Sequence, residues 1–89
     1  MPKAEISWKR KTEEGDKLQV NAQRVGGEWI FSQRGGRYDQ WQPVAEPPLE
    51  DWKELLDAVQ RLINRRRLQP IHEEHVRRRM RERFPEADF

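Results

Sequence analysis

Two consecutive glycines, Gly26 and Gly27, separate two β-prone segments, residues 17–25 and 28–34. A two-residue β-turn needs backbone with positive φ, which glycine adopts without steric cost, so this pattern is typical of a tight β-hairpin. Side chains alternate between the two faces of a strand, and the position of the turn therefore decides which residues share a face. No other feature of the chain constrains its fold as strongly.

The predicted hairpin register gives the two faces very different chemistry. One face is apolar and is expected to belong to the core; it carries Leu18, Val20, Ala22, Trp29 and Phe31. The opposite face carries hydrogen-bonding groups with almost no acid, namely Gln19, Asn21, Gln23, Ser32 and Arg34. This polar face is the one candidate binding surface that the register predicts.

Further β-structure is expected on both sides of the hairpin. Residues 6–10 alternate between apolar and polar types, as a half-buried strand does. A second glycine pair at residues 35–36 predicts another tight turn, followed by a short fourth strand over residues 38–41. In that register Ile30 pairs with Trp41, which places two apolar side chains on the otherwise polar face.

The second half of the chain predicts two helices. Residues 42–48 contain three prolines and predict a rigid connector rather than a strand. Apolar residues then recur at helical spacing, which predicts a first helix over residues 49–67. Pro70 interrupts this helix and favours a new start, so we expect a second helix over residues 70–84 and a tail over residues 85–89.

These elements together predict one α+β domain over residues 1–89. Its small antiparallel sheet, of three to four strands within residues 5–41, is expected to be packed on one face by the C-terminal helical hairpin. The chain shows no apolar run that would act as a secretion signal or membrane span, so a cytoplasmic protein is expected.

The sequence does not predict an enzyme, a metal site or a cofactor. There is no cysteine. His72 and His75 stand three residues apart, whereas a zinc-protease helix places its histidines four apart, and no third histidine completes a site. Neither a glycine-flanked nucleophile nor a phosphate-binding glycine loop is present. No small-molecule substrate is therefore evident.

Arginines gather in the predicted helices, although the formal net charge is only +2. Both helices begin acidic and finish basic, as the helix dipole favours, and several arginines have an acid four residues away. The arginines without such an acid form a possible basic patch, namely Arg65, Arg66, Arg67, Arg79, Arg81 and Arg83. Solvated helix faces and binding of a polyanion both account for them.

Two functions fit these observations. The first is nucleic-acid binding, because amide and guanidinium groups on alternate residues of a β-ribbon reach base edges while flanking cations hold phosphates. The supporting cations are then Lys9, Lys11 and Arg37. The alternative is a protein-interaction or homodimerisation module that uses Ile30, Trp41 and the arginine-rich helices. A polar sheet face also needs no ligand at all, since antiparallel sheets commonly leave one face in water.

Overall fold

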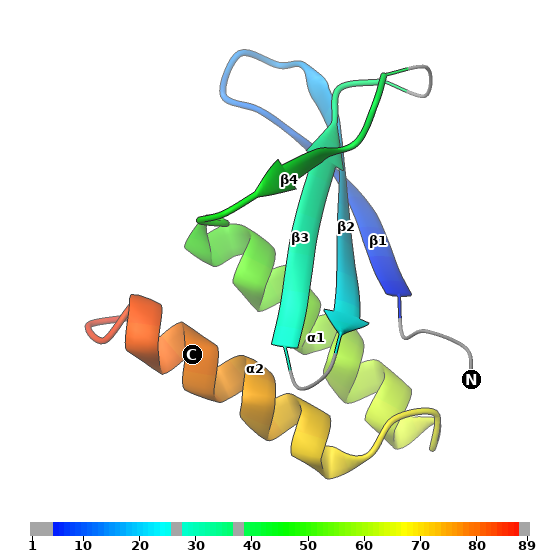
Figure 1. Ribbon diagram of the computed structural model, residues 1–89, viewed down its shortest axis with the longest axis vertical. Coiled ribbons are helices and arrows are strands. Elements are labelled where there is room, and N and C mark those ends of the chain that lie inside the picture. Colours follow the sequence, from blue (N-terminus) through cyan, green and yellow to red (C-terminus); the bar gives the residue numbers. More distant parts are fainter. Residues whose placement is uncertain (1–4, 26–27, 37–38, 88–89) are drawn as a thin grey trace. The chain divides into compact units, whose positions relative to one another are not determined.

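A computed structural model describes residues 5–25, 28–36 and 39–87 of the protein (Figure 1). A four-stranded antiparallel sheet is followed along the chain by two helices, which confirms the predicted α+β class. The chain divides into two compact units, a sheet unit, Met1–Glu46, and a helical unit, Pro47–Phe89.

The sheet unit contains strands β1 (Glu5–Lys11), β2 (Lys17–Val25), β3 (Glu28–Arg34) and β4 (Gln42–Val44). Their spatial order follows the chain, β1-β2-β3-β4, and every neighbouring pair is antiparallel (Figure 1). The β2–β3 register pairs Val25 with Glu28 and Ala22 with Phe31, as the hairpin prediction requires. The glycine pair that predicts this register lies outside the described residues.

Four of the five residues predicted for the apolar face of the hairpin are buried, and Leu18 is half-buried. Val20, Ala22 and Phe31 are at most 2% exposed, and Trp29 is also buried. Strand β1 extends this face, because Trp8 pairs with Val20 and its ring meets Phe31 edge to face, with centroids 6.2 Å apart. Burial of each large apolar side chain stabilises the fold by about 1.5–3 kcal/mol.

The fourth strand differs from the prediction in position. Residues 39–41 are not a strand, residue 38 lies outside the described residues, and β4 begins at Gln42 inside the expected connector. Pro43 is tolerated there because β4 is an edge strand, where proline's missing N–H need not break a ladder on both sides. The expected pairing of Ile30 with Trp41 is therefore wrong: β4 pairs with Phe31, Ser32 and Gln33.

The helical unit contains α1 (Leu49–Asn64) and α2 (Pro70–Arg83). Helix α1 starts directly after Pro48 and buries one apolar stripe, whereas α2 buries a thinner line. The stripe of α1 comprises Trp52, Leu55, Leu56 and Val59, and that of α2 includes Val76 and Met80. In the described part of the chain, no helix combines the length and the apolar composition that crossing a membrane requires.

Helix α1 ends three residues earlier than predicted. The N–H of Arg66 donates to the Ile63 carbonyl and the N–H of Arg67 donates to the Leu62 carbonyl, both at 2.9 Å. These two bonds, with the positive φ of 60° at Arg66, form a Schellman motif that closes the helix. The sequence hides this ending because the left-handed position, usually a glycine, is occupied by an arginine.

Candidate nucleic-acid interface

Strand pairing assembles one continuous polar surface on the sheet. The β1–β2 register places Ser7 opposite Asn21 and Lys9 opposite Gln19, so β1 contributes its own polar side chains to the polar hairpin face. We define the polar sheet face by ten residues on this side: Glu5, Ser7, Lys9, Lys11, Lys17, Gln19, Asn21, Gln23, Ser32 and Arg34. Val25, Glu28 and Ile30 lie on the same side at the hairpin end and are not counted in it. Of the residues predicted for this function, only Arg37 lies outside the described residues.

Positive charge on the polar sheet face is concentrated at the end near the β1–β2 connection. Lys11 stands directly opposite Lys17, and both side chains are exposed. One pairing step further along the strands, Lys9 faces Gln19, which in turn faces Arg34. Two like charges directly opposite each other destabilise a sheet. The loop that connects these two lysines carries the acids Glu13, Glu14 and Asp16.

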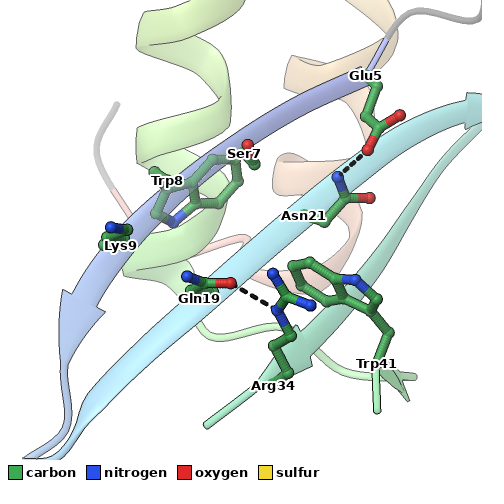
Figure 2. A pocket seen from close by; sticks show the side chains of 8 residues that line it. All are labelled: Glu5, Ser7, Trp8, Lys9, Gln19, Asn21, Arg34 and Trp41. Carbon is green, nitrogen blue, oxygen red and sulfur yellow. Dashed lines mark hydrogen bonds between the residues drawn. The ribbon is translucent and has the colours of Figure 1, made fainter. Parts of the chain in front are cut away.

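The polar sheet face is hollowed at its centre. An open hollow of about 380 Å³ is formed by side chains from β1, β2 and β3 and from the loop that follows β3 (Figure 2). Its lining residues are Glu5, Ser7, Trp8, Lys9, Gln19, Asn21, Arg34 and Trp41. Six of them belong to the polar sheet face, whereas Trp8 belongs by register to the apolar face and Trp41 precedes β4. Strand pairing thus brings together four of the predicted binding residues, Lys9, Gln19, Asn21 and Arg34.

Two side-chain hydrogen bonds hold the lining of the hollow in place (Figure 2). The Asn21 amide donates through Nδ2 to Glu5 Oε1 at 2.6 Å, and Arg34 donates through Nε to Gln19 Oε1 at 2.6 Å. Asn21 is only 6% exposed, so its bond to Glu5 satisfies a polar group that would be costly to bury alone. Asn21 therefore serves as the floor of the hollow rather than as a projecting side chain.

An aromatic ring stands at the wall of the hollow. The guanidinium carbon of Arg34 lies 4.5 Å from the centroid of the Trp41 ring, within the range of a cation–π interaction (Figure 2). Trp41 remains 41% exposed. Arg34 also donates a hydrogen bond to Gln19 of β2, which fixes its guanidinium, and the guanidinium in turn orients the Trp41 indole. The sequence predicted Arg34 as a nucleic-acid contact and Trp41 as a protein contact, and the structure places these two side chains against each other.

Sequence reasoning missed three members of the polar sheet face, Glu5, Ser7 and Lys17. The alternation of β1 was visible in the sequence, but its register against β2 was not assigned, so its outward residues were not placed beside the hairpin. The role of Trp41 was missed for a different reason. Trp41 precedes β4 and does not belong to a strand, and strand alternation therefore says nothing about its direction.

The arginines predicted as one basic patch lie at opposite ends of α2. Those at residues 65–67 follow α1, whereas Arg81 and Arg83 belong to the last turn of α2. At 1.5 Å per residue, most of the length of α2, about 15 Å or more, separates the two groups. Arg79 also has an acidic partner three residues away, which a search for acids at a spacing of four did not find: its Nη1 lies 3.2 Å from Glu82 Oε2. The single patch is not formed.

The two histidines lie in the first turns of α2, with ring centroids 6.3 Å apart. Over residues 5–25, 28–36 and 39–87, no group of three or more histidine, aspartate or glutamate side chains is arranged to hold a metal ion.

Comparison with known proteins finds no relative: no protein-family model, no curated protein and no solved structure matches this chain. The function is therefore argued from the geometry of the polar sheet face.

Proposed function

We propose that this protein binds nucleic acid through the polar sheet face and does so without catalysing a reaction. The observation that carries this proposal is the hollow, where cationic, amide and aromatic side chains from separate segments converge. Protein–nucleic acid contacts combine cations on phosphates with hydrogen bonds and stacking on bases, and the polar sheet face offers all three kinds of group. The proposal keeps the cytoplasmic location expected from the sequence, a compartment in which RNA is abundant.

The phosphate contacts are assigned to the lysines of β1 and β2. Lys9, Lys11 and Lys17 are exposed and share one end of the polar sheet face. The opposition of Lys11 and Lys17 is unfavourable in the free protein, and a bound phosphate removes that repulsion. Two acidic side chains of the strands lie on this side of the sheet, Glu5 and Glu28. Both lie toward the end away from the lysines, and Glu5 accepts the hydrogen bond of Asn21. Glu13, Glu14 and Asp16 lie in the loop between Lys11 and Lys17, so the phosphate contacts are assigned to the lysines on the face itself and not to that loop.

The proposed role is binding because the lining of the hollow offers no arrangement for covalent catalysis. Ser7 is the hydroxyl among the lining residues, and these residues include no histidine that would activate it. Glu5, the lining carboxylate, is bonded to the buried Asn21.

Fluorescence anisotropy with labelled oligonucleotides tests this function. Wild-type protein is titrated into a duplex and into a single strand at low and at moderate salt. Affinity should fall as salt rises, because cations on the protein displace counterions from the phosphates. In the Lys11→Gln/Lys17→Gln double variant the slope of log affinity against log salt should decrease by about 1.5, since each lost phosphate contact removes about 0.7–0.9.

The matched control is Lys53→Gln, which removes an exposed lysine of α1 in the helical unit. This variant should keep the wild-type slope and affinity. The absence of binding at low salt, or binding that salt does not weaken, would contradict the proposed function.

A protein contact is the second candidate function, favoured by a specific pair of side chains. Val25 and Ile30 are each 48% exposed and lie on the same side of the sheet as the polar sheet face, toward the end of the hairpin away from the lysines. Exposed aliphatic neighbours of this kind favour self-association. Light scattering over a range of concentrations tests it, and a monomer at every concentration would rule out homodimerisation.

A further inference from the structure

The hollow has a shape and a lining that distinguish between two forms of nucleic acid. A duplex is read by side chains that project into a groove, whereas an unpaired base is taken into a concave site and stacked on an aromatic ring. The sequence suggested the first mode, with Gln19 and Asn21 as readers of base edges. The geometry of the polar sheet face favours the second.

The two central amides of the sheet do not project as groove readers. The Asn21 amide donates to Glu5 and is buried, and the Gln19 carbonyl oxygen accepts a bond from Arg34. Both side chains line a concave hollow rather than a ridge (Figure 2). The volume of about 380 Å³ lies within the range of sites that hold small organic ligands, about 300–1,000 Å³.

The wall of the hollow supplies the stacking surface that an unpaired base needs. Trp41 is 41% exposed and lines the hollow, so part of its ring is accessible to a planar ligand. The Arg34 guanidinium at 4.5 Å fixes the indole before any ligand arrives, which lowers the entropic cost of binding. Every base has a π-face, so a ring of this kind accepts a base without strict sequence preference.

Two lysines follow one another along β1, starting at the hollow. Lys9 lines the hollow, and Lys11 follows it on the same face of β1, about 7 Å farther along. A flexible backbone whose base occupies the hollow can run past these two ammonium groups. A rigid duplex, whose bases are already stacked in pairs, cannot insert one base without first being opened, which costs a few kcal/mol.

We propose that the hollow binds an unpaired base of a single-stranded nucleic acid, with the base stacked on Trp41 and the neighbouring phosphates at Lys9 and Lys11. This inference rests on the proposed nucleic-acid function and specifies its ligand.

The test compares four ligands with one protein. Anisotropy at low salt measures binding of wild-type protein to a labelled oligothymidine strand, to an abasic strand of the same length, to a duplex and, by competition, to thymidine monophosphate. The abasic strand keeps the phosphates and lacks the bases. The oligothymidine strand should bind most tightly of the four. Equal affinity for the abasic strand or the duplex would overturn the inference, as would equal affinity for the mononucleotide, which would make the hollow a nucleotide pocket.

Variants of Trp41 then locate the base. Trp41→Ala should weaken binding of the oligothymidine strand about 5- to 150-fold, the range that one lost stacking contact produces, and should leave the abasic strand unaffected. Trp41→Phe retains a ring and should recover most of the loss. Circular dichroism verifies that both variants are folded; if Trp41→Ala is not, the Phe variant and the abasic strand with wild-type protein still decide the question.

The outcomes separate this inference from the proposed function. If Trp41→Ala binds the oligothymidine strand as wild type does while Lys11→Gln weakens strand and duplex alike, base stacking is wrong and nucleic-acid binding stands. If wild-type protein binds none of the oligonucleotides at low salt, both fail.

Discussion

The sheet unit and the helical unit both carry many cations, but they arrange them differently. In the helical unit arginines lie beside acids of the same helix, in ion pairs of 3.0, 3.1 and 3.2 Å: Asp57–Arg61, Glu73–Arg77 and Arg79–Glu82. On the polar sheet face Lys11 stands opposite Lys17, and Lys9 stands opposite an amide. The sheet therefore places like charges together, whereas the helices place opposite charges together.

This difference shows why counting charges does not locate a binding surface. The helical unit is richer in arginine, yet its acidic starts, basic ends and ion pairs are what isolated helices favour for their own stability. Lys11 and Lys17 give each other no such benefit, and the acids nearest to them in the chain, Glu13, Glu14 and Asp16, belong to the connecting loop. Cations whose arrangement costs stability are better candidates for a ligand than cations whose arrangement provides it.

The largest expected effect separates the two faces of the sheet. Phe31→Ala removes a side chain that is 2% exposed and meets the Trp8 ring, so the free energy of unfolding should fall by about 3–5 kcal/mol. Val25→Ala, on the opposite side and 48% exposed, should change it by less than about 0.5 kcal/mol. Urea denaturation followed by tryptophan fluorescence measures both. Equal effects would show that the apolar and polar faces are wrongly assigned.

A smaller loss is expected at the floor of the hollow. Asn21→Ala removes the amide that donates to Glu5 Oε1, and the free energy of unfolding should fall by about 1–3 kcal/mol because a buried polar contact is lost. Gln23→Ala, on the same face of β2, is the control and should cost less than about 0.5 kcal/mol. Urea midpoints at constant slope compare the two. A neutral Asn21→Ala would mean that the bond to Glu5 does not hold the hollow together.

In the helical unit one substitution should raise stability. Arg66→Gly places glycine at a φ of 60°, a conformation that costs arginine about 1 kcal/mol and costs glycine little. Glycine also makes the unfolded chain more flexible, which offsets part of this benefit. The free energy of unfolding should therefore rise by about 0.5 kcal/mol. Arg65→Gly, at a φ of −90°, is the control and should destabilise the protein. Thermal unfolding measures both, and a loss with Arg66→Gly would contradict the assigned Schellman motif.

Much of the fold could be predicted because its signals are local. The glycine pair lies only a few residues from the strands whose β2–β3 register it predicts. The helical spacing of apolar residues likewise predicted the position of α1. The fourth strand was misplaced because the sequence suggests a tight turn after β3, whereas β4 begins only at Gln42. Between them the Asp39 N–H donates to the Gly36 carbonyl at 3.0 Å. The end of α1 was missed because Arg66 occupies the position where glycine is usual.

The candidate site was less predictable because it depends on contacts between distant segments. Alternation placed Gln19, Asn21 and Arg34 on one face, but it could not show that two of these groups bond to each other and the third to Glu5. The stacking of Arg34 on Trp41 depends on the path of a loop. Periodicity predicts which face a strand residue occupies, and it predicts nothing about the direction of a loop residue.

The smallest expected effects are those of removing one exposed cation, and they change the free energy of unfolding in opposite directions in the two units. Lys11→Gln removes one of two opposed like charges, so the free energy of unfolding should rise by a few tenths of a kcal/mol at low salt. Arg61→Gln removes a partner of Asp57, 3.0 Å away and one turn earlier, and should lower it by about 0.2–0.5 kcal/mol. Both differences should shrink in high salt, where exposed charges are screened. If both substitutions changed stability in the same direction, the lysines of the sheet would not be held at a cost to the fold, and the case for an anionic ligand there would lose its energetic basis.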